Sequence, residues 1–216
     1  MHIHVLKRVN SMAKLYFRYG AMNCGKTASL LQVAYNYKER DRKIILIKPK
    51  CDLKGGNKVV SRIGISRDVD YLINDDEKII EVLANNLEGV DCILADEAQF
   101  FKPNQIDELF ILSKIYDIPV VCYGLKSDFK TNSFPGSQRL FELADELTEL
   151  ETICRCGKKA RFNARIVNGE FVSEGAQVAI DGIDDISYEA LCGKCYLEKV
   201  LKYEKDIKSP KMLKKN

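Results

Sequence analysis

The chain has 216 residues, 46% of them hydrophobic, and a formal net charge of +3. This composition excludes wholesale disorder, and the length suits one domain with a small additional module. No apolar stretch reaches the roughly 18 residues that a membrane span needs, and the run from Ile3 to Leu6 is too short for the core of a secretory signal. We therefore expect a cytoplasmic protein without a membrane partner.

Basic residues are concentrated at the two ends of the chain. Residues 202–216 contain six lysines, and residues 1–11 contain Lys7 and Arg8. The remaining chain is slightly acidic, which argues against a dedicated nucleic-acid-binding protein. We expect both ends to be disordered, and we expect Met12 to be the native start, with residues 1–11 an extension.

The only two histidines are His2 and His4. With a native start at Met12, the folded body contains no histidine, which excludes Ser-His-Asp triads and histidine-ligated zinc. Any general base must then be a carboxylate, a lysine, a tyrosine or a cysteine.

Strands and helices alternate through the first part of the chain. Apolar runs predict four buried strands, at residues 15–19, 43–47, 90–95 and 119–123. Helical spacing of apolar residues predicts four helices, over residues 25–40, 79–87, 106–115 and 140–150. The polar, glycine-rich residues 51–58 predict a loop. This alternation predicts an α/β fold, a parallel sheet covered by helices on both faces.

The pattern changes after Leu150 to short alternating strands. Asn168 and Gly169 separate the segments Arg161–Val167 and Glu170–Ser173, which predicts a hairpin. We therefore expect an α/β domain over residues 13–150 and a small β-rich domain over residues 151–201.

The first predicted strand leads into the pattern G-x-x-x-x-G-K-[ST]. It is made by Gly20, Ala21, Met22, Asn23, Cys24, Gly25, Lys26 and Thr27. Between a strand and a helix, such a loop turns its backbone N–H groups toward phosphate oxygens. Lys26 would then reach the β- and γ-phosphates, and Thr27 would ligate Mg²⁺. The alternative is a tight turn that caps an ordinary helix.

Two acids follow the third predicted strand, where an open parallel sheet binds its ligands. Asp96 suits the Mg²⁺ side of a P-loop enzyme, which leaves Glu97 to take a proton from a nucleophile. The alternative is that both acids only cap the next helix.

Aromatic residues cluster around the segment after the fourth strand. Lys126-Ser127-Asp128 resembles the guanine-binding pattern N-K-x-D, but Leu125 stands where asparagine is needed. The aromatics that could wall a nucleobase are Phe100, Phe101, Tyr123, Phe129 and Phe134. The alternative is that they belong to the core.

Four of the eight cysteines are paired by short spacings. Cys154 and Cys156 form one pair, and Cys192 and Cys195 form the other. In a reducing compartment this pattern is typical of a closed, structural zinc site. Disulfides or free thiols are the alternative.

Together these segments resemble type II thymidine kinases, the kind found in bacteria and in the animal cytosol. The resemblance covers about residues 13–201. It rests on LYFRYGAMNCGKT at 15–27, VVSRIG at 59–64, DEAQF at 96–100, YGLKSDF at 123–129 with Phe134, CRCG at 154–157, and the final C-x-x-C. It implies a RecA-like P-loop domain, a zinc-bearing lasso domain, and transfer of the ATP γ-phosphoryl group to the 5′-hydroxyl of thymidine or deoxyuridine with Mg²⁺.

The resemblance also implies residue roles and partners. Glu97 would be the base on the 5′-hydroxyl. ATP and its phosphates would be bound by residues 20–27 with Arg62, Asp96, Glu97, Ala98 and Gln99. The nucleoside would be bound by Met22, Phe100, Leu125, Phe129, Phe134, Val178, Ala179, Ile180, Asp181, Gly182 and Tyr188. Members are typically homotetramers inhibited by thymidine triphosphate.

Two features depart from the family pattern. Cys51-Asp52-Leu53-Lys54 stands where the family often has Asp-x-Arg, so either Lys54 or Arg62 would supply the phosphate cation. The lasso is longer than usual and has Asp181 where the family favours glycine. Two other functions stay open: a P-loop ATPase that acts on nucleic acid, and a nucleotide sensor without catalysis.

Overall fold

The computed structural model describes residues 12–177 and 185–203, which form two compact units. The first unit contains residues 12–19, Gly25–Lys126 and Ser133–Leu150. The second contains Gly20–Cys24, Ser127–Asn132 and the described residues from Glu151 onward. Residues 178–182, expected to contact the nucleoside, lie outside the described residues.

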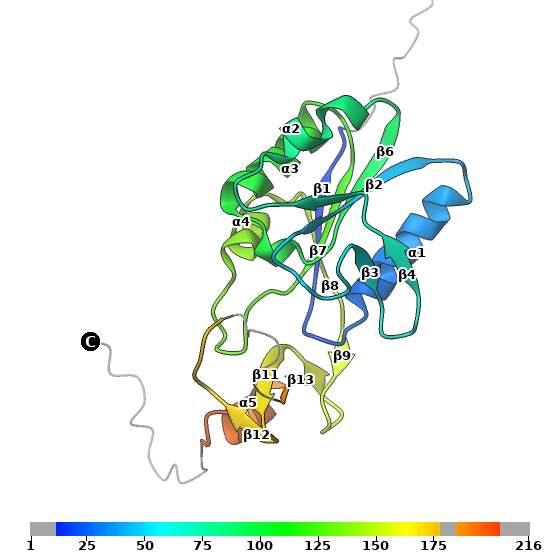
Figure 1. Ribbon diagram of the computed structural model, residues 1–216. Helices are drawn as coiled ribbons and strands as arrows, with labels where there is room; N and C mark the ends of the chain where they lie inside the picture. Colours follow the sequence, from blue (N-terminus) through cyan, green and yellow to red (C-terminus); the bar gives the residue numbers. More distant parts are fainter. Residues whose placement is uncertain (1–11, 178–184, 204–216) are drawn as a thin grey trace, which may run out of the picture. The chain divides into compact units, whose positions relative to one another are not determined.

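The first unit is built on a six-stranded sheet in the order β5-β2-β6-β7-β1-β8 (Figure 1). Its strands are β1 (Leu15–Tyr19), β2 (Lys43–Pro49), β5 (Tyr71–Ile73), β6 (Val90–Ala95), β7 (Val120–Gly124) and β8 (Glu146–Glu149). Every neighbouring pair is parallel. The predicted parallel sheet is therefore confirmed.

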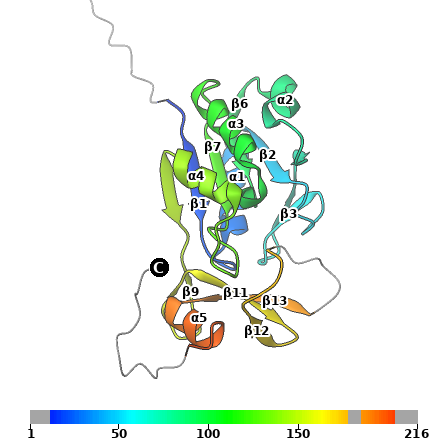
Figure 2. The same ribbon diagram turned by 90° about the vertical axis from the view of Figure 1, so that its left-hand side faces the viewer.

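Helices cover both faces of this sheet (Figures 1 and 2). Helix α1 (Lys26–Lys38) covers one face, and α2 (Ile79–Leu83), α3 (Pro103–Lys114) and α4 (Pro135–Leu143) cover the other. Side chains alternate along each strand, so Ile45 and Ile47 pack toward α3 while Leu46 packs toward α1. Because both faces are buried, the strands are continuous apolar runs.

The helix predicted over residues 140–150 is wrong in its second half. Helix α4 ends at Leu143, and β8 follows as an edge strand parallel to β1. Asp145 makes this change: its carboxylate accepts bonds from the Leu15 N–H (2.7 Å) and from the Lys114 ammonium (2.6 Å). These partners are remote in sequence, so helical spacing could not reveal them.

Other short elements were also missed by the sequence. Strand β5 and the hairpin β3 (Lys58–Val60) with β4 (Ser66–Asp68) have three residues each, too few for a periodic pattern. Single turns of 3₁₀ helix, η1 (Ala84–Asn86) and η2 (Ala98–Phe100), follow α2 and β6.

The second unit contains a three-stranded antiparallel sheet in the order β12-β11-β13. Its elements are β9 (Thr152–Ile153), β10 (Lys159–Ala160), β11 (Phe162–Val167), β12 (Glu170–Val172), β13 (Ile186–Leu191) and α5 (Gly193–Lys199). Asn168 and Gly169 form the turn between β11 and β12 with positive φ angles of 50° and 84°. The predicted hairpin is therefore confirmed, because a two-residue turn of this kind needs positive φ at both positions.

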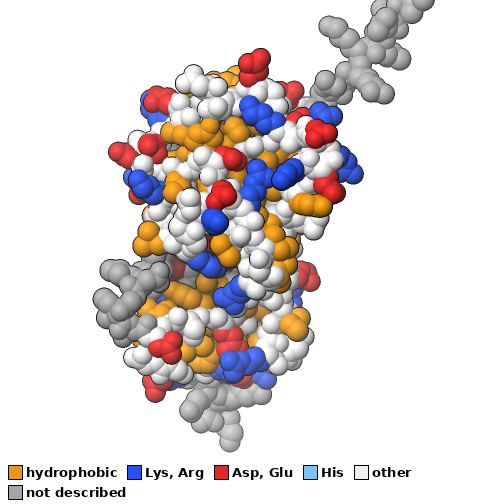
Figure 3. Space-filling model, turned by 45° about the vertical axis from the view of Figure 1, so that its right-hand side comes forward, with side chains coloured by type: hydrophobic (Ala, Val, Ile, Leu, Met, Phe, Trp, Pro, Cys, Tyr) orange, Lys and Arg blue, Asp and Glu red, His pale blue; other side chains and the backbone are white. Residues whose placement is uncertain are grey.

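The surface carries both signs of charge. Lys and Arg side chains are interspersed with Asp and Glu on the face shown in Figure 3. Among the described residues, no helix is both long and apolar enough to cross a bilayer.

Candidate functional site

The predicted phosphate loop lies between β1 and α1, as its sequence context requires. Asn23 and Gly25 have positive φ angles of 66° and 82°. A Cβ atom on Gly25 would meet no other atom within 4 Å, so glycine is favoured there by backbone conformation and not by space. Helix α1 then begins at Lys26, whose side chain is buried.

A small pocket in the first unit joins three of the predicted residues, Thr27, Asp96 and Glu97. They come from the start of α1 and from the end of β6. The rest of the pocket is lined by Lys48, Asp52, Lys54, Lys58, Val59 and Val60. Hydroxyl and carboxylate oxygens beside several lysines form a site that suits a hard cation and phosphate groups.

Asp96 is the buried acid of this pocket, with 5% of its surface exposed. Its backbone N–H donates to the carbonyl of Ile47 on the adjacent strand (3.0 Å). Burial is the largest cause and the neighbouring Glu97 carboxylate the second, and together they raise the pKa of Asp96 to about 7. A cation in the pocket would favour the ionised carboxylate.

Glu97 is held by a buried glutamine. Glu97 has a positive φ of 46°, and its Oε2 accepts a hydrogen bond from Gln99 Nε2 (2.6 Å). Gln99 Oε1 in turn accepts the N–H of Leu125 after β7 (3.0 Å). A Cβ on Gly124 would lie 2.7 Å from this Oε1, so a larger residue there would displace the Gln99 amide. Gln99, expected among the phosphate-binding residues, lies where it orients one carboxylate oxygen of Glu97.

Lys48 is a buried cation of the pocket that the sequence analysis missed. It is 1% exposed, and its ammonium contacts Asp52 Oδ2 (2.8 Å) and donates to the carbonyl of Lys54 (2.6 Å). The one available signal was a lysine within an otherwise buried strand. Arg62 is exposed in the turn between β3 and β4 and does not line this pocket.

The predicted nucleoside-binding aromatics divide between the two units. In the first unit, the rings of Phe100 and Phe134 meet edge to face with centroids 5.5 Å apart, and Leu125 is buried. In the second unit, Phe129 is buried beneath the Arg165 guanidinium, whose carbon lies 3.7 Å from the ring centroid. Two further aromatics, Phe101 and Tyr123, belong to the core clusters of the first unit.

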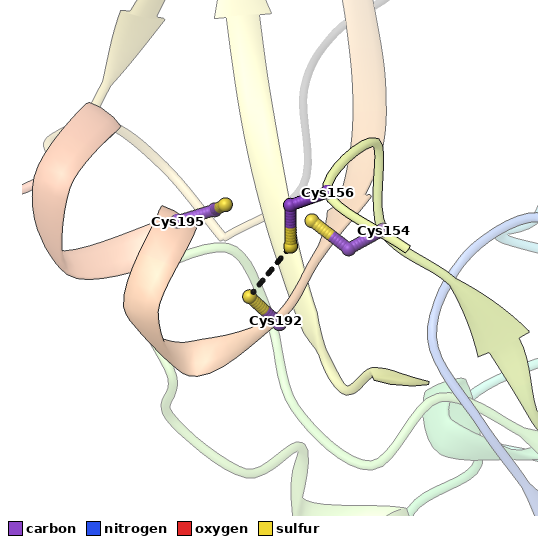
Figure 4. A group of neighbouring side chains, drawn as sticks. All are labelled: Cys154, Cys156, Cys192 and Cys195. Atoms are coloured by element: carbon purple, nitrogen blue, oxygen red, sulfur yellow. Dashed lines mark hydrogen bonds between the residues drawn. The ribbon is translucent and has the colours of Figure 1, made fainter. Parts of the chain in front are cut away.

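The four paired cysteines gather in the second unit (Figure 4). Cys154 and Cys156 lie in the turn between β9 and β10, while Cys192 and Cys195 lie at the start of α5. Their sulfurs are within 4.8 Å of one another, and those of Cys156 and Cys192 are 3.5 Å apart. Four thiolates bound at about 2.3 Å to one zinc ion would lie about 3.8 Å apart, so the cluster fits this metal.

The four neighbouring thiols also change one another's pKa values. Hydrogen bonds with the thiols of Cys156 and Cys154 raise the pKa of Cys195 to about 12. Burial opposes ionisation of Cys154, but the backbone N–H groups of Cys156 and Cys192 outweigh it and lower the pKa of Cys154 to about 6. Thiolates crowded together in this way need a shared cation to ionise fully. None of the four is in a disulfide.

Comparison with known proteins identifies the family. The family model for thymidine kinase matches residues 13–196. A thymidine kinase of Haemophilus influenzae (strain ATCC 51907 / DSM 11121 / KW20 / Rd) is 45% identical over 192 residues, which are 87% of this chain and 98% of that protein. A thymidine kinase of Francisella tularensis subsp. tularensis (strain SCHU S4 / Schu 4) is 41% identical over 196 residues, 88% of this chain and 99% of that protein.

Likeness to solved structures is weaker. The replication initiator DnaA bound to AMPPCP and single-stranded DNA matches 66% of this chain and 41% of its own, with 20% identity and a TM-score of 0.41, which supports no argument about the reaction. The family match and the close bacterial relatives, in contrast, span nearly all of the described fold. The chain belongs to the thymidine kinase family.

Proposed function

We propose that this chain transfers the γ-phosphoryl group of ATP to the 5′-hydroxyl of thymidine or deoxyuridine. The observation that carries this proposal is the pocket in which Thr27, Asp96 and Glu97 meet beside Lys48 and Lys54. It combines groups for phosphate, for a hard cation and for proton removal. Family membership supplies the substrate, since the relatives are thymidine kinases.

Glu97 is the proposed general base. Its carboxylate takes the proton of the 5′-hydroxyl, the hydroxyl oxygen attacks the γ-phosphorus, and the bond to the β-phosphate oxygen breaks to release ADP. The bond from Gln99 fixes one oxygen of Glu97 and leaves the other for the substrate. Backbone N–H groups of residues 20–27 other than that of Met22, which donates to Asn163, are proposed to bind the phosphates together with the ammonium of Lys26.

Mg²⁺ fits the oxygen donors of Thr27 and Asp96, and when bound it neutralises charge on the β- and γ-phosphates. We assign the additional phosphate cation to Lys54, because it lines the pocket and Arg62 does not. Lys48 holds the Lys54 carbonyl and the Asp52 carboxylate in place.

The nucleoside is assigned to the aromatic residues named above. The thymine site is proposed to be lined by the backbone of residues 178–182 and by the side chains of Met22, Phe100, Leu125, Phe129, Phe134 and Tyr188.

We further propose a nucleotide-binding domain over residues 13–150 and a lasso domain over residues 151–201, stabilised by zinc on the four cysteines. The support is the cysteine geometry together with the family match.

Regulation and assembly are proposed from family membership. We expect a homotetramer in the cytoplasm that thymidine triphosphate inhibits and that has no nucleic-acid partner. The slight excess of acidic residues between the two basic ends of the chain supports the last point, since a nucleic-acid surface is dominated by lysine and arginine.

An ATP-consumption assay with Mg²⁺ over a panel of nucleosides tests the reaction. We expect turnover that depends on thymidine and that falls in the Glu97→Gln variant. ATP hydrolysis without nucleoside dependence would favour the nucleic-acid ATPase, and tight ATP binding without any turnover would favour the sensor.

A further inference from the structure

One buried side chain of the cysteine-bearing unit contacts the phosphate loop directly. Asn163 lies on β11 and is 4% exposed. Its Oδ1 accepts the backbone N–H of Met22 (2.7 Å), and its Nδ2 donates to the carbonyl of Ser127 (2.9 Å). All three residues belong to the second unit. Asn163 therefore joins the middle of the phosphate loop to the segment after β7.

The two bonds require an amide at this position. One partner is a donor and the other is an acceptor, so the side chain must offer both functions at once. Aspartate would keep the bond to Met22 but would turn a second oxygen toward the Ser127 carbonyl. Alanine would leave the Met22 N–H and the Ser127 carbonyl without this partner, and an unsatisfied buried group costs free energy.

The bond acts at a constrained point of the loop. Asn23, directly after Met22, has a φ of 66°, a left-handed conformation that non-glycine residues rarely adopt. Such a conformation persists when surrounding contacts impose it. Because the Met22 N–H is bonded to Asn163, this peptide group is fixed directly before the left-handed residue of the loop.

A neighbouring residue on the same strand has different partners. Arg165 shares a strand face with Asn163, since side chains two residues apart point the same way. Its guanidinium donates to the carbonyls of Ala176 (2.8 Å) and Gln177 (3.1 Å) and to the Tyr188 hydroxyl (2.9 Å). Arg165 thus holds Tyr188, which is assigned to the nucleoside, and Asn163 holds the loop assigned to ATP.

We propose that Asn163 is a positioning residue for ATP: through Met22 it sets the conformation of the phosphate loop. The inference rests on the proposed function only for the identity of the nucleotide. It predicts that ATP affinity depends on a residue outside the P-loop motif, in the unit that carries the cysteines.

The test is the ATP dissociation constant, measured by titration calorimetry with Mg²⁺ and without nucleoside. We expect Asn163→Ala to weaken ATP binding about tenfold, the effect of losing one buried hydrogen bond. Asn163→Asp keeps the acceptor for Met22 but places a carboxylate oxygen against the Ser127 carbonyl and a negative charge beside the loop, so it should also weaken ATP binding. The exposed Asn85 supplies the matched control, and Asn85→Ala should bind ATP as the unchanged chain does.

The Arg165→Met variant distinguishes a specific effect of Asn163 on the phosphate loop from a general destabilisation of the second unit. It should raise the KM for thymidine more than the dissociation constant for ATP, the reverse of Asn163→Ala. Unchanged ATP affinity in both Asn163 variants would overturn the proposal, as would an equal loss in Asn163→Ala and Arg165→Met. Asn163→Asp keeps the side-chain shape and serves if the alanine variant fails to fold. Because these titrations contain no nucleoside, failure of the unchanged chain to phosphorylate thymidine would refute the proposed function alone.

Discussion

Two adjacent acids at the end of β6 have different surroundings and are suited to different tasks. Asp96 is nearly fully buried against β2, while Glu97 is partly exposed and has one oxygen bonded to Gln99. Environment commonly divides neighbouring carboxylates between separate roles in this way. The buried acid suits the cation side of the pocket, and the more accessible one suits the substrate hydroxyl.

Replacing Glu97 by glutamine should remove the base and preserve the shape of the site. We expect turnover to fall about 10²- to 10⁴-fold, the usual contribution of a general base. ATP affinity should stay nearly unchanged, because the phosphate loop is intact. Steady-state phosphorylation of thymidine and a direct ATP titration measure the two quantities. Glu81→Gln, at an exposed carboxylate of α2, is the control, and near-normal turnover in Glu97→Gln would refute the assignment.

The raised pKa of Asp96 predicts a pH-dependent stability. The pKa of an aspartate in an unfolded chain is about 3.9, whereas burial raises the pKa of Asp96 in the folded chain to about 7. Between these values the folded chain binds a proton that the unfolded chain has lost. The contribution of Asp96 to the free energy of unfolding is therefore full below the lower pKa, and it is lost as the pH rises toward the higher one.

Asp96→Asn should remove this dependence in protein without Mg²⁺. Urea denaturation at about pH 5 and about pH 8 should show a smaller decline for the variant than for the unchanged chain. Asp76→Asn, at an exposed carboxylate, should leave the decline as it is. Identical declines in the unchanged chain and in Asp96→Asn would contradict the raised pKa.

At the scale of elements, helix α4 supports the segment that carries Gln99. Gly136 in its first turn packs against the backbone of η2 and Phe101. A Cβ there would overlap the carbonyl oxygen of Phe101 and lie 2.9 Å from those of Ala98 and Gln99. Since these are backbone atoms, they cannot swing aside, and either the helix or the turn after Glu97 must move.

Gly136→Ala should therefore destabilise the first unit by about 1–3 kcal/mol, the usual cost of overpacking. It should also lower turnover, because Gln99 and with it Glu97 would shift. Urea denaturation measures the first effect and the thymidine assay the second. Ser133→Ala, just before the same helix at an exposed position, is the control. If Gly136→Ala left the free energy of unfolding unchanged, the close packing of Gly136 against the backbone of residues 98–101 would not require glycine.

On the scale of the whole molecule, the two units have separate sources of stability. The first has apolar clusters on both faces of its sheet. The second has a smaller cluster that includes Cys154, Cys192 and Cys195 themselves. A small core rarely supplies enough free energy alone, so a metal on these cysteines would contribute directly to folding.

Cys192→Ser should therefore lose zinc and weaken the second unit more than the first. Elemental analysis should show about one zinc per chain before the change and far less after it. Hydrogen exchange should rise in β11 and β13 and stay slow in β2 and β6. Cys51→Ser, at an exposed cysteine outside the cluster, should change neither quantity. Unchanged metal content in Cys192→Ser would refute the assignment of these ligands.

The local features of this protein were predictable because neighbouring residues define them. The phosphate loop between β1 and α1 and the turn at Asn168-Gly169 each depend on a few consecutive residues whose backbone preferences agree. The pairs Cys154–Cys156 and Cys192–Cys195 were likewise recognisable from spacing. Alternation of apolar strands with helices was enough to predict the sheet type and its two covered faces.

Other features depended on contacts between remote residues. Strand β8 follows Asp145, which bonds to Leu15 from 130 residues away, and Asn163 reaches Met22 from 141 residues away. Lys48 became a pocket residue only because β2 lies beside β6. A hydrogen bond can stabilise the fold whether its partners are near or far apart in sequence. The local sequence pattern, however, predicts only bonds between residues that are near. Three-dimensional packing therefore selected which polar side chains serve the site.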